Sequence, residues 1–558
     1  MLILSRTYAR VLRAARRFDE AIIANEQLLK SRPQDRAAMY ELGRALHSAG
    51  QRRRAVETLA LTANEGSVAA TRDLCRYGAR GRLKTRTEGI FPPEDYDSFT
   101  KSNPTPQPPP TSTTTHFAVR LGAPSSPNNQ TLRSLKEQSH AAWHVAHDDD
   151  SSPGQQPGMF DLVLPAGAVL DRHCLAWLNW AIDQTACTTV RADHDHFVAN
   201  TDARCDPVLL PQPDFLWTEN AKGIARLAAH GPGEARIAHL PLTLMTLPVD
   251  EAPVPRPLPD APPRPITVII PSRDNPKLLL AAVSTLLSQA SEPDLVEIIV
   301  LDNRSRTRSA AVLFEHLAER ANTRVLQFDE PFNWSRANNF GAVDATGDTL
   351  LFLNDDTEML TSGWDRVIAG LLADPRVGLV GSRMLYPDET IQHGGFVFGM
   401  DNGPQHEGRW FPADDPGPAG RWIAVRQAVA VTGAFMAIRS QDFHALGGFD
   451  GANFAVDFAD VDLCLRVRKR GMAVAYCGAI TLRHHESVSR GLNLSRIQRA
   501  RMRRERRRFE ARWGEVARYD PGYHPAWTRT GCAYDGLQAP GLDEIVRHVL
   551  AGARAWIC

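Results

Sequence analysis

The sequence predicts an α/β protein whose largest unit is a doubly wound sheet, and three observations lead to this prediction. Strand-like and helix-like stretches alternate from residue 266 onward. The segment ITVIIP (266–271) is a continuous apolar run, as expected of a strand covered on both faces, and EIIVLDN and TLLFLNDD follow the same plan. Helical segments are expected between these strands, near 276–289, 309–321 and 335–345. Repeated β-α-β units form a parallel, right-handed sheet with helices on both faces.

The composition is that of an ordinary globular protein. The chain has 558 residues, enough for several domains, and its Lys+Arg and Asp+Glu totals are both 64. Such a balance gives no indication of a nucleic-acid partner. The eight cysteines include no C-x-x-C pair, which argues against a zinc site or a disulfide framework. Without a signal-like or membrane-spanning apolar run, a cytoplasmic location is expected.

Residues 1–80 are predicted to be helical repeats. Ala21 and Ala55 lie 34 positions apart, and small residues in ELGRALHSAGQRRRAVETL would let two helices cross closely. A period of about 34 residues resembles tetratricopeptide repeats, which implies a protein partner for this segment. A plain helical hairpin is the alternative.

Proline-rich stretches divide the rest of the chain. The segment KSNPTPQPPPTSTTT carries no apolar side chains and predicts an extended linker. The expected parts are therefore a linker at 81–115, a middle domain at 116–250, a second linker at 251–265, a catalytic domain at 266–530 and a tail at 531–558.

Polar side chains follow three predicted strands of the C-terminal sheet. The run LLFL ends on Asn354, Asp355 and Asp356, another strand ends on Ser272-Arg273-Asp274, and a third ends on Asp302-Asn303. Ligands of such sheets bind outside the carboxyl ends of the strands. One polar strand end is ordinary, and a simple loop explains it. Three of them in one sheet predict a shared site, where paired carboxylates would hold a cation.

At this point the motifs resemble a known family. The chain contains, in order, PITVIIPSRDN, IIVLDNRS, NWSRANNFGAVDATGDTLLFLNDDTEM, VTGAFMAIR, GGFD, FADVDLCLRVRKRG and HHESVSRG. This order is similar to that of inverting family 2 glycosyltransferases with the GT-A fold, and in particular to rhamnosyltransferase-like enzymes of bacterial surface polysaccharide and O-antigen assembly. The resemblance implies transfer of a sugar from a nucleotide-diphosphate donor to a glycan or lipid-linked saccharide acceptor.

The resemblance also implies roles for residues of the donor site. A divalent cation, Mg²⁺ or Mn²⁺, would bridge the donor diphosphate and act as a Lewis acid. Asp356 takes the place of the family's metal-binding aspartate, while Asn354 departs from the usual acid at the first position of that motif. The remaining expected donor contacts are Asp302 at the nucleobase, Ser272 and Asp274 in the nucleotide pocket, Asn338 near the diphosphate or sugar, and Asp355. For Asp302 the alternative is a cap at the strand end.

A general base is expected in FADVDLCLR. By resemblance Asp460 occupies the base position, and Ala459 replaces an acid that is usual there. A carboxylate opposite the leaving group can take the acceptor proton in a single inverting displacement. Asp462 lies two residues further on, so on a helix it points away from Asp460 and serves as a charge near the helix N-terminus.

The segment after the next strand contains two adjacent histidines. In the family a histidine here often joins the metal or contacts the diphosphate. Neighbouring side chains on an extended segment point in opposite directions, so only one of His484 and His485 can face the site, and His485 is the predicted one.

Two glycines and one basic segment bear on the acceptor. The family places acceptor contacts near Gly433 and near Gly448, although a plain turn also explains the Gly-Gly pair. The segment RIQRARMRRERRRFEARW predicts a basic helix. Such a helix is either a solvated face or a contact with anionic lipid headgroups or a phosphorylated acceptor, which would make the protein peripheral at the inner face of the cytoplasmic membrane.

The middle segment has the outline of the catalytic one. In FDLVLPAGAVLDRHCLAWLNWAI, Pro165, Ala166 and Gly167 stand where Asn354, Asp355 and Asp356 stand in the later copy. This predicts a degenerate GT-A-like domain that lacks the acids and serves as scaffold or acceptor-binding unit. The residues Asp193 to His196 alternate acid and histidine, and we expect them to be solvated in a polar loop.

Two other classes of function compete with the enzyme hypothesis. A scaffold or glycan-binding protein would need no catalytic acids, whereas Asp302, Asp356 and Asp460 are all present. A nucleotidyltransferase on a similar sheet would carry a glycine-rich phosphate loop, and PSRDNPK contains no glycine. The sequence therefore favours a glycosyltransferase.

Overall fold

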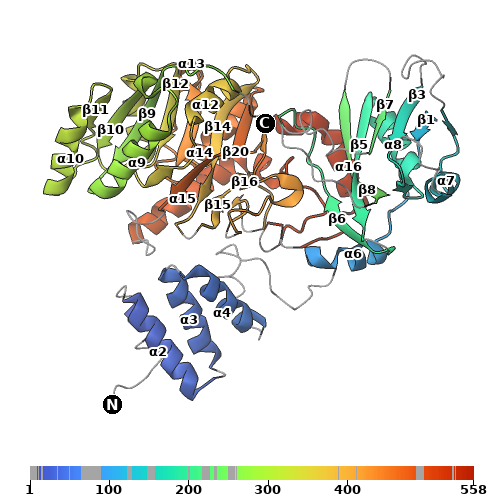
Figure 1. Cartoon of the computed structure of the whole chain (residues 1–558), viewed down its shortest axis with the longest axis horizontal. Helices are drawn as coiled ribbons and strands as arrows, with labels where there is room; N and C mark the ends of the chain where they lie inside the picture. The colour runs from blue at the N-terminus through green and yellow to red at the C-terminus, as the bar shows by residue number, and fades with distance from the viewer. Residues whose placement is uncertain are drawn as a thin grey trace.

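The computed structural model describes residues 17–64, 89–121, 129–146, 158–198, 201–216, 227–231, 236–248, 260–485, 496–530 and 536–557, apart from single residues within these ranges, together with a few isolated residues elsewhere. Three parts are visible (Figure 1): a group of N-terminal helices, a smaller sheet and a larger sheet. No helix within these ranges combines the length and the apolar character needed to cross a bilayer.

The larger sheet confirms the predicted doubly wound α/β plan. Its strands are β9 (Ile266–Ser272), β10 (Val296–Asp302), β11 (Thr323–Gln327), β12 (Thr349–Leu353), β13 (Thr357–Met359), β14 (Val377–Leu385), β15 (Ile391–His393), β18 (Val425–Gln427), β19 (Phe435–Arg439) and β20 (Ala473–His484). Neighbours run in the order β11-β10-β9-β12-β19-β14-β20-β13. The four strands β11, β10, β9 and β12 are parallel to one another. Strand β19 is antiparallel to both of its neighbours, β12 and β14, and β14 and β20 are parallel. Asp302 pairs with Ser272, so two of the polar strand ends lie level.

Helices cover both faces of this sheet. One core contains side chains of α9 (Pro276–Gln289), α10 (Arg308–Ala318) and α12 (Trp364–Leu372). The opposite core contains those of α11 (Trp334–Val343), α13 (Ser440–Ala445), α14 (Ala459–Lys469) and α15 (Arg496–Trp513). Strands buried on both sides explain the continuous apolar runs in the sequence.

The smaller sheet repeats the pattern of the larger one. Its strands are β1 (His116–Leu121), β2 (Trp143–Val145), β3 (Met159–Leu164), β4 (Val169–Leu170), β5 (Thr189–Phe197), β6 (Arg204–Val208), β7 (Leu227–His230) and β8 (Ile237–Leu247), and its helices are α7 (Asn129–Lys136) and α8 (Cys174–Thr185). The order β2-β1-β3-β7-β5-β8-β4 has the same parallel and antiparallel neighbours as β10-β9-β12-β19-β14-β20-β13. Strand β3 therefore corresponds to β12, and residues 165–167 to residues 354–356.

The end of the chain belongs to the core of the smaller sheet. Helix α16 (Leu542–Ala551) packs on β8 and α8, and its Ile545 and Val549 are completely buried there. The short helix η5 (Gly552–Trp556) also contacts β8. The prediction of a C-terminal tail at 531–558 is wrong, because the apolar residues at i and i+4 of α16 close a core more than 300 positions away in the sequence.

The acid–histidine run of the middle segment is also buried, which corrects the expectation of a solvated loop. Residues 193–196 lie on β5, and Asp193 and Asp195 are both 0% exposed. Buried carboxylates require partners. Asp193 accepts hydrogen bonds from His239, His524 and the backbone of Leu210, whereas Asp195 accepts one from Tyr96.

The N-terminal part consists of α2 (Phe18–Ser31), α3 (Arg36–Ser48) and α4 (Arg52–Asn64). Gly43 allows the close crossing that the sequence suggested, because a Cβ there would lie 2.6 Å from Leu59 Cγ. The tetratricopeptide assignment remains a prediction, since residues 65–88 lie outside the described ranges.

Within the expected linker 81–115, the structure differs from a plain extended chain. It contains η1 (Pro93–Asp95) and α6 (Tyr96–Ser102), and Tyr96 is buried because its hydroxyl reaches Asp195. Shorter elements complete the fold: β16 (Phe396–Val397), β17 (Gln405–His406), η2 (Pro293–Leu295), η3 (Pro418–Gly420) and η4 (Val516–Arg518).

Candidate functional site

A cavity of about 500 Å³ opens at the carboxyl ends of β9, β10 and β12, as the sequence predicts. Residues from many separate segments of the C-terminal domain, between positions 271 and 501, surround it. The lining residues are Pro271, Ser272, Arg273, Asn303, Phe332, Trp334, Asn354, Asp355, Asp356, Gln392, His406, Arg409, Thr432, Gly433, Ala434, Val456, Asp460, His484, Gln498 and Arg501. Of the predicted site residues, Ser272, Asn354, Asp355, Asp356, Gly433 and Asp460 are thus brought together.

Asp355 and Ser272 join the ends of two strands. The Ser272 hydroxyl donates to Asp355 Oδ2 at 2.7 Å. Burial raises the pKa of Asp355 to about 6, and the neighbouring charge of Asp356 contributes to the rise. A carboxyl that resists ionisation in this way is poised to gain from a cation at the same site.

Asp356 lies beside His484, and the prediction that His485 faces the site is wrong. His484 Nε2 is 3.0 Å from Asp356 Oδ1, whereas His485 Nε2 lies 2.9 Å from Glu358 Oε1 on the other side of the strand. The two histidines do point to opposite faces of the strand, with His484 and not His485 toward the cavity. The HHESVSRG motif continues into residues 486–495, which lie outside the described ranges.

The tautomer of His484 is set by Gln392. The carboxamide Oε1 of Gln392 only accepts, and it lies 2.6 Å from His484 Nδ1, so Nδ1 carries a proton. In neutral His484 the lone pair of Nε2 then points at Asp356 Oδ1. Asn354 Nδ2 lies 3.4 Å from the same nitrogen, and a proton or a metal ion between His484 Nε2 and Asp356 Oδ1 would remove the repulsion of the two acceptors. This donor set fits a divalent cation, with Gln392 orienting the histidine ligand.

Asp460 lies in the first turn of α14 and lines the cavity. Gly433 N–H donates to its Oδ2 at 2.9 Å, and Val461 N–H donates to its Oδ1 at 2.8 Å. Burial raises the pKa of Asp460 despite these bonds. Gly433 is required at this position, because a Cβ would lie 2.7 Å from the Trp334 ring and 3.3 Å from Asp460 Cβ.

Asp462 has a structural role, as the helical geometry predicts. It is completely buried, and its carboxylate binds Arg466 at 2.8 Å, Arg512 at 2.9 Å and Trp513 Nε1 at 2.9 Å. It therefore fastens the end of α15 to α14 and does not face the cavity.

Three predicted donor residues lie behind the cavity wall. Asp302 accepts from Ser305 N–H, and Asp274 accepts from the backbone of Arg306 and Thr307, so both carboxylates order the loop after β10. Asn338 is buried, and its Oδ1 has no partner among the described residues. Gly448 has a backbone φ of +69° and lies against the side chain of Asn339. It is also absent from the cavity lining. The positive φ explains why a glycine stands at 448, and an acceptor contact there stays a prediction.

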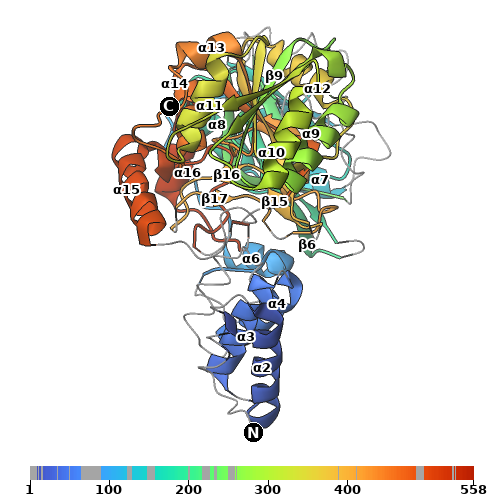
Figure 2. The same cartoon turned by 90° about the vertical axis from the view of Figure 1, so that its left-hand side faces the viewer.

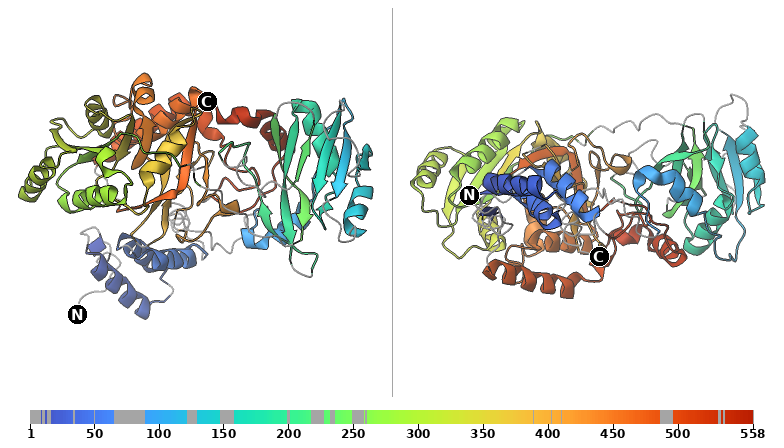
Figure 3. Two further views of the ribbon diagram at one scale, coloured as in Figure 1. Left: turned by 45° about the horizontal axis from the view of Figure 1, so that its top comes forward. Right: turned by 90° about the horizontal axis from the view of Figure 1, so that it is seen from below.

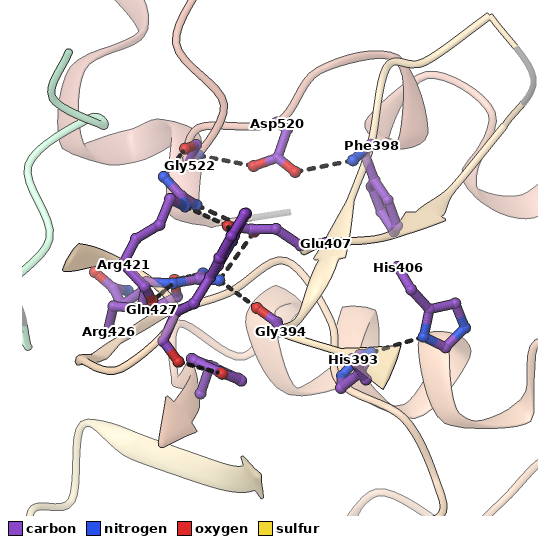
Figure 4. A network of polar contacts seen from close by, with 12 residues as sticks. His393, Gly394, Phe398, His406, Glu407, Arg421, Arg426, Gln427, Asp520 and Gly522 are labelled. Atoms are coloured by element: carbon purple, nitrogen blue, oxygen red, sulfur yellow. Dashed lines mark hydrogen bonds and ion pairs between the residues drawn. The ribbon is translucent and has the colours of Figure 1, made fainter. Parts of the chain in front are cut away.

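The segment 391–427 forms a rim of the cavity, to which it contributes Gln392, His406 and Arg409, and none of these residues was predicted. Figure 4 shows how it is held: Glu407, which is fully buried, binds both Arg421 and Arg426. Thr432 N–H donates to His393 Nε2, so His393 Nδ1 carries its proton and donates to His406 Nδ1 at 2.8 Å. His406 therefore keeps its own proton on Nε2 as it lines the cavity with Arg409. No sequence motif indicated the rim, because its conformation depends on contacts that form only in the folded chain, such as those of Glu407 with Arg421 and Arg426.

A second polar cluster joins the smaller sheet to the end of the chain. Asp193, His239 and His524 lie close enough to share a metal ion. However, Ala526 N–H donates to His524 Nδ1, so the proton of neutral His524 is on Nε2, the atom that a metal would need. His239 donates from Nε2 to Asp193 Oδ1 and accepts from His548 Nε2, while His524 Nε2 lies 2.7 Å from Asp193 Oδ2, so hydrogen bonds link the three histidines to one carboxylate. A hydrogen-bonded clasp explains this cluster without a metal.

Several known proteins are similar to parts of this chain. An uncharacterised protein, y4gI, of Sinorhizobium fredii is 34% identical over 261 residues, 47% of this chain and 29% of the relative. The O-antigen biosynthesis protein RfbC of Myxococcus xanthus is 36% identical over 227 residues, 40% of this chain and 18% of the relative. The chain thus matches less than a third of the length of these curated relatives.

Solved structures of glycosyltransferases are similar to part of the chain. GalNAc-T7 with UDP, GalNAc and Mn²⁺ aligns at a TM-score of 0.35 and 15% identity, covering 40% of this chain and 44% of that one. A mannosyltransferase of Pyrobaculum calidifontis with GDP-Man and Mn²⁺ aligns at 0.35 and 18%, covering 48% and 71%. Residues 267–396 match the model of glycosyl transferase family 2. The segment that supplies β9 to β15 and the paired acids of the cavity is therefore a glycosyl transferase family 2 segment within this chain.

Proposed function

We propose that the protein transfers a sugar from a nucleotide-diphosphate donor to a glycan or lipid-linked glycan acceptor, with inversion, in bacterial surface polysaccharide synthesis. One observation carries the proposal: Asp355 and Asp356, at one end of the sheet, line the same cavity as Asp460 of α14. A donor-binding group and a candidate base thus face a common space. The similarity to an O-antigen biosynthesis protein supports the biological setting.

The donor end of the cavity is formed by the ends of β9 and β12. Asp356 and His484 would hold the divalent cation, Mg²⁺ or Mn²⁺, and Asp355 with Ser272 would position it against the diphosphate. The cation supplies charge neutralisation for the leaving diphosphate. Asn303 lines the same cavity and Asp302 does not, so Asn303 is the one of the two that would contact the nucleotide.

The acceptor end is formed by Asp460 and the rim. The carboxylate of Asp460 takes the proton from the attacking hydroxyl as the new glycosidic bond forms, and its raised pKa makes it a stronger base than an ordinary aspartate. Backbone donors from Gly433 and Val461 hold the carboxylate in one orientation. His406 and Arg409 offer donors on the opposite side of the cavity for acceptor hydroxyl or phosphate oxygens.

A non-catalytic scaffold or glycan-binding protein is the competing function. A thermal-shift screen of nucleotide sugars, with and without Mg²⁺ or Mn²⁺, separates the two, because a ligand stabilises the native state by mass action. The enzyme requires at least one donor whose stabilisation depends on the metal, and product analysis with that donor must show an inverted anomeric configuration. Absence of any metal-dependent nucleotide binding would leave only the scaffold.

A further inference from the structure

Helix α15 has one side that is buried in the fold and an opposite side that is exposed and rich in arginine. It contains nine arginines and two glutamates. Its buried side chains are Glu505, Phe509 and Trp513, spaced four apart, and this side packs on the C-terminal domain. The opposite side carries Arg496, Ala500, Arg503 and Arg507, all exposed. Figure 2 and the right-hand view of Figure 3 show α15 along the outer flank of that domain.

The arginines near the buried side have partners in the fold. Arg501 binds Asp457 and Glu505, and Arg512 binds Asp450 and Asp462. The guanidinium of Arg508 donates to backbone carbonyls, and Arg506 binds the exposed Glu510. These contacts account for the packing of the helix and for both of its acids.

The outward arginines are left without such partners. Among the described residues, Arg503, Arg504 and Arg507 have no hydrogen bond or ion pair, and together with Ala500 and Arg508 they line a shallow surface groove. Arg503 and Arg507 lie four apart, where like charges repel. The fold gains nothing from this repulsion, which a solvated helix could avoid with glutamate or glutamine. An anionic surface outside the protein would relieve it.

The position of the helix indicates what that surface does. Gln498 and Arg501 of α15 line the cavity that also holds Asp460, and so does Phe332, which is 42% exposed. Ile497, in the first turn of α15, is 83% exposed. Cations spread over ~16 Å of one helix, with bare apolar side chains near the cavity, match a flat interface of anionic headgroups and acyl chains better than a single phosphate. A nucleic acid would gain nothing from Ile497.

We propose that the outward face of α15, formed by Arg503, Arg504 and Arg507 with Ile497 at its edge, docks the protein on an anionic lipid bilayer. Docking there sets the acceptor end of the cavity against the membrane surface. The docking itself is independent of glycosyl transfer, and only its purpose, presentation of a membrane-held acceptor to Asp460, rests on the function proposed above.

The test is co-sedimentation of the full chain with vesicles. Vesicles of phosphatidylglycerol and phosphatidylcholine should bind the protein, vesicles of phosphatidylcholine alone should not, and binding should weaken as salt is raised. The variant Arg503→Gln/Arg504→Gln/Arg507→Gln should bind anionic vesicles at least about tenfold more weakly, since each basic side chain near the surface contributes to the attraction. A matched variant, Lys30→Gln/Arg32→Gln/Arg308→Gln, removes equal charge from exposed positions of other elements and should bind like the parent.

The variant must also fold, and the structure predicts that it does. Removing the repulsion between outward arginines should leave the thermal midpoint unchanged or slightly raised. Equal binding of the α15 variant and the parent, or equal binding to neutral and anionic vesicles, overturns the proposal. Tight binding of a single-stranded RNA without vesicle binding overturns it in favour of a nucleic-acid surface. Donor binding, measured on the same samples without vesicles, tests the proposed function separately.

Discussion

The two sheets of this protein share one plan of strands but differ where each central strand ends. Strand β12 runs into Asn354, Asp355 and Asp356 at the cavity, whereas β3 runs into Pro165, Ala166 and Gly167. Between β19 and β20 the larger sheet has α13 and α14, and α14 carries Asp460. Between β7 and β8 only six residues connect the corresponding strands of the smaller sheet. The copy that lacks the acids therefore also lacks the helix that would supply a base.

This difference shows that the strand framework and the chemistry are separable. Both sheets retain buried cores, because the fold depends on apolar strand faces and not on the residues at the strand ends. The smaller sheet now holds the clasp around Asp193, which fixes the end of the chain, where the larger sheet holds a cavity. If the comparison is correct, variants at the strand ends should abolish activity with little loss of stability, and variants at the clasp should do the opposite.

The largest effect is expected for Asp460→Asn. An amide keeps the shape of the carboxyl but cannot accept the acceptor proton, so turnover should fall by about 10²–10⁴-fold while donor affinity changes little. Turnover and donor affinity are measured separately, by product formation and by calorimetry. Asp462→Asn is the control: it should lower thermal stability through Arg466, Arg512 and Trp513 and leave the chemical step nearly intact. If Asp462→Asn loses more turnover than Asp460→Asn, the assignment of Asp460 as the base is wrong.

The variant Asp356→Ala tests whether one sheet alone binds the donor. If the proposed cation holds the diphosphate to the protein, removing this carboxylate should weaken the binding of metal and nucleotide together, by roughly tenfold or more. Calorimetry on the full chain should then detect no second metal-dependent nucleotide site that keeps the affinity of the parent. Residual tight binding would mean that the smaller sheet, despite Pro165, Ala166 and Gly167, has kept a site of its own.

The substitution Ile545→Ala tests the dependence of the smaller sheet on the end of the chain. Ile545 is completely buried in the core of that sheet, and large-to-small changes at such positions cost about 2–5 kcal/mol. Thermal unfolding should show the loss, and donor binding at 20 °C or so should persist because the cavity belongs to the other sheet. Leu550→Ala, at an exposed position of the same helix, is the matched control. An unchanged unfolding free energy for Ile545→Ala would contradict the packing of α16.

How much of this arrangement could be predicted from the sequence depends on the distance between partners. The acids of the cavity were predictable, because parallel strands place their carboxyl ends at one edge and each end is a local signal. The choice between His484 and His485 was not, because the pairing of β14 with β20 shifts register between Ser382 and Arg383. Such an irregularity changes which face each later residue occupies.

Partners that are remote in sequence leave no local signal. Asp193 is ionised and buried only because His524, 331 positions away, and His239 bind it. Without these partners, the alternation of acid and histidine at residues 193–196 indicates a polar loop exposed to solvent. The apolar residues of α16 were likewise visible in the sequence, but nothing near them indicates that β8 is their partner.

The smallest effect expected is a loss of stability in mild acid, and it arises at the clasp. Burial lowers the pKa of His239 and lowers that of His548 well below its usual value. A histidine whose pKa is lowered in the folded state contributes full stability above the unfolded value of about 6.5, and this contribution is lost as the pH falls below it. A proton added to His239 Nδ1 would face the N–H of His548 Nε2. Full titration of a histidine should therefore lower the free energy of unfolding by about 1.4 kcal/mol for each unit by which folding lowers its pKa. Urea unfolding between pH 7.5 and 5 measures the slope. In His548→Gln the slope should be shallower, because one titrating group is gone. Glu, Asp and other histidines titrate equally in the parent and in the variant, so an identical slope for both would remove the clasp as its cause.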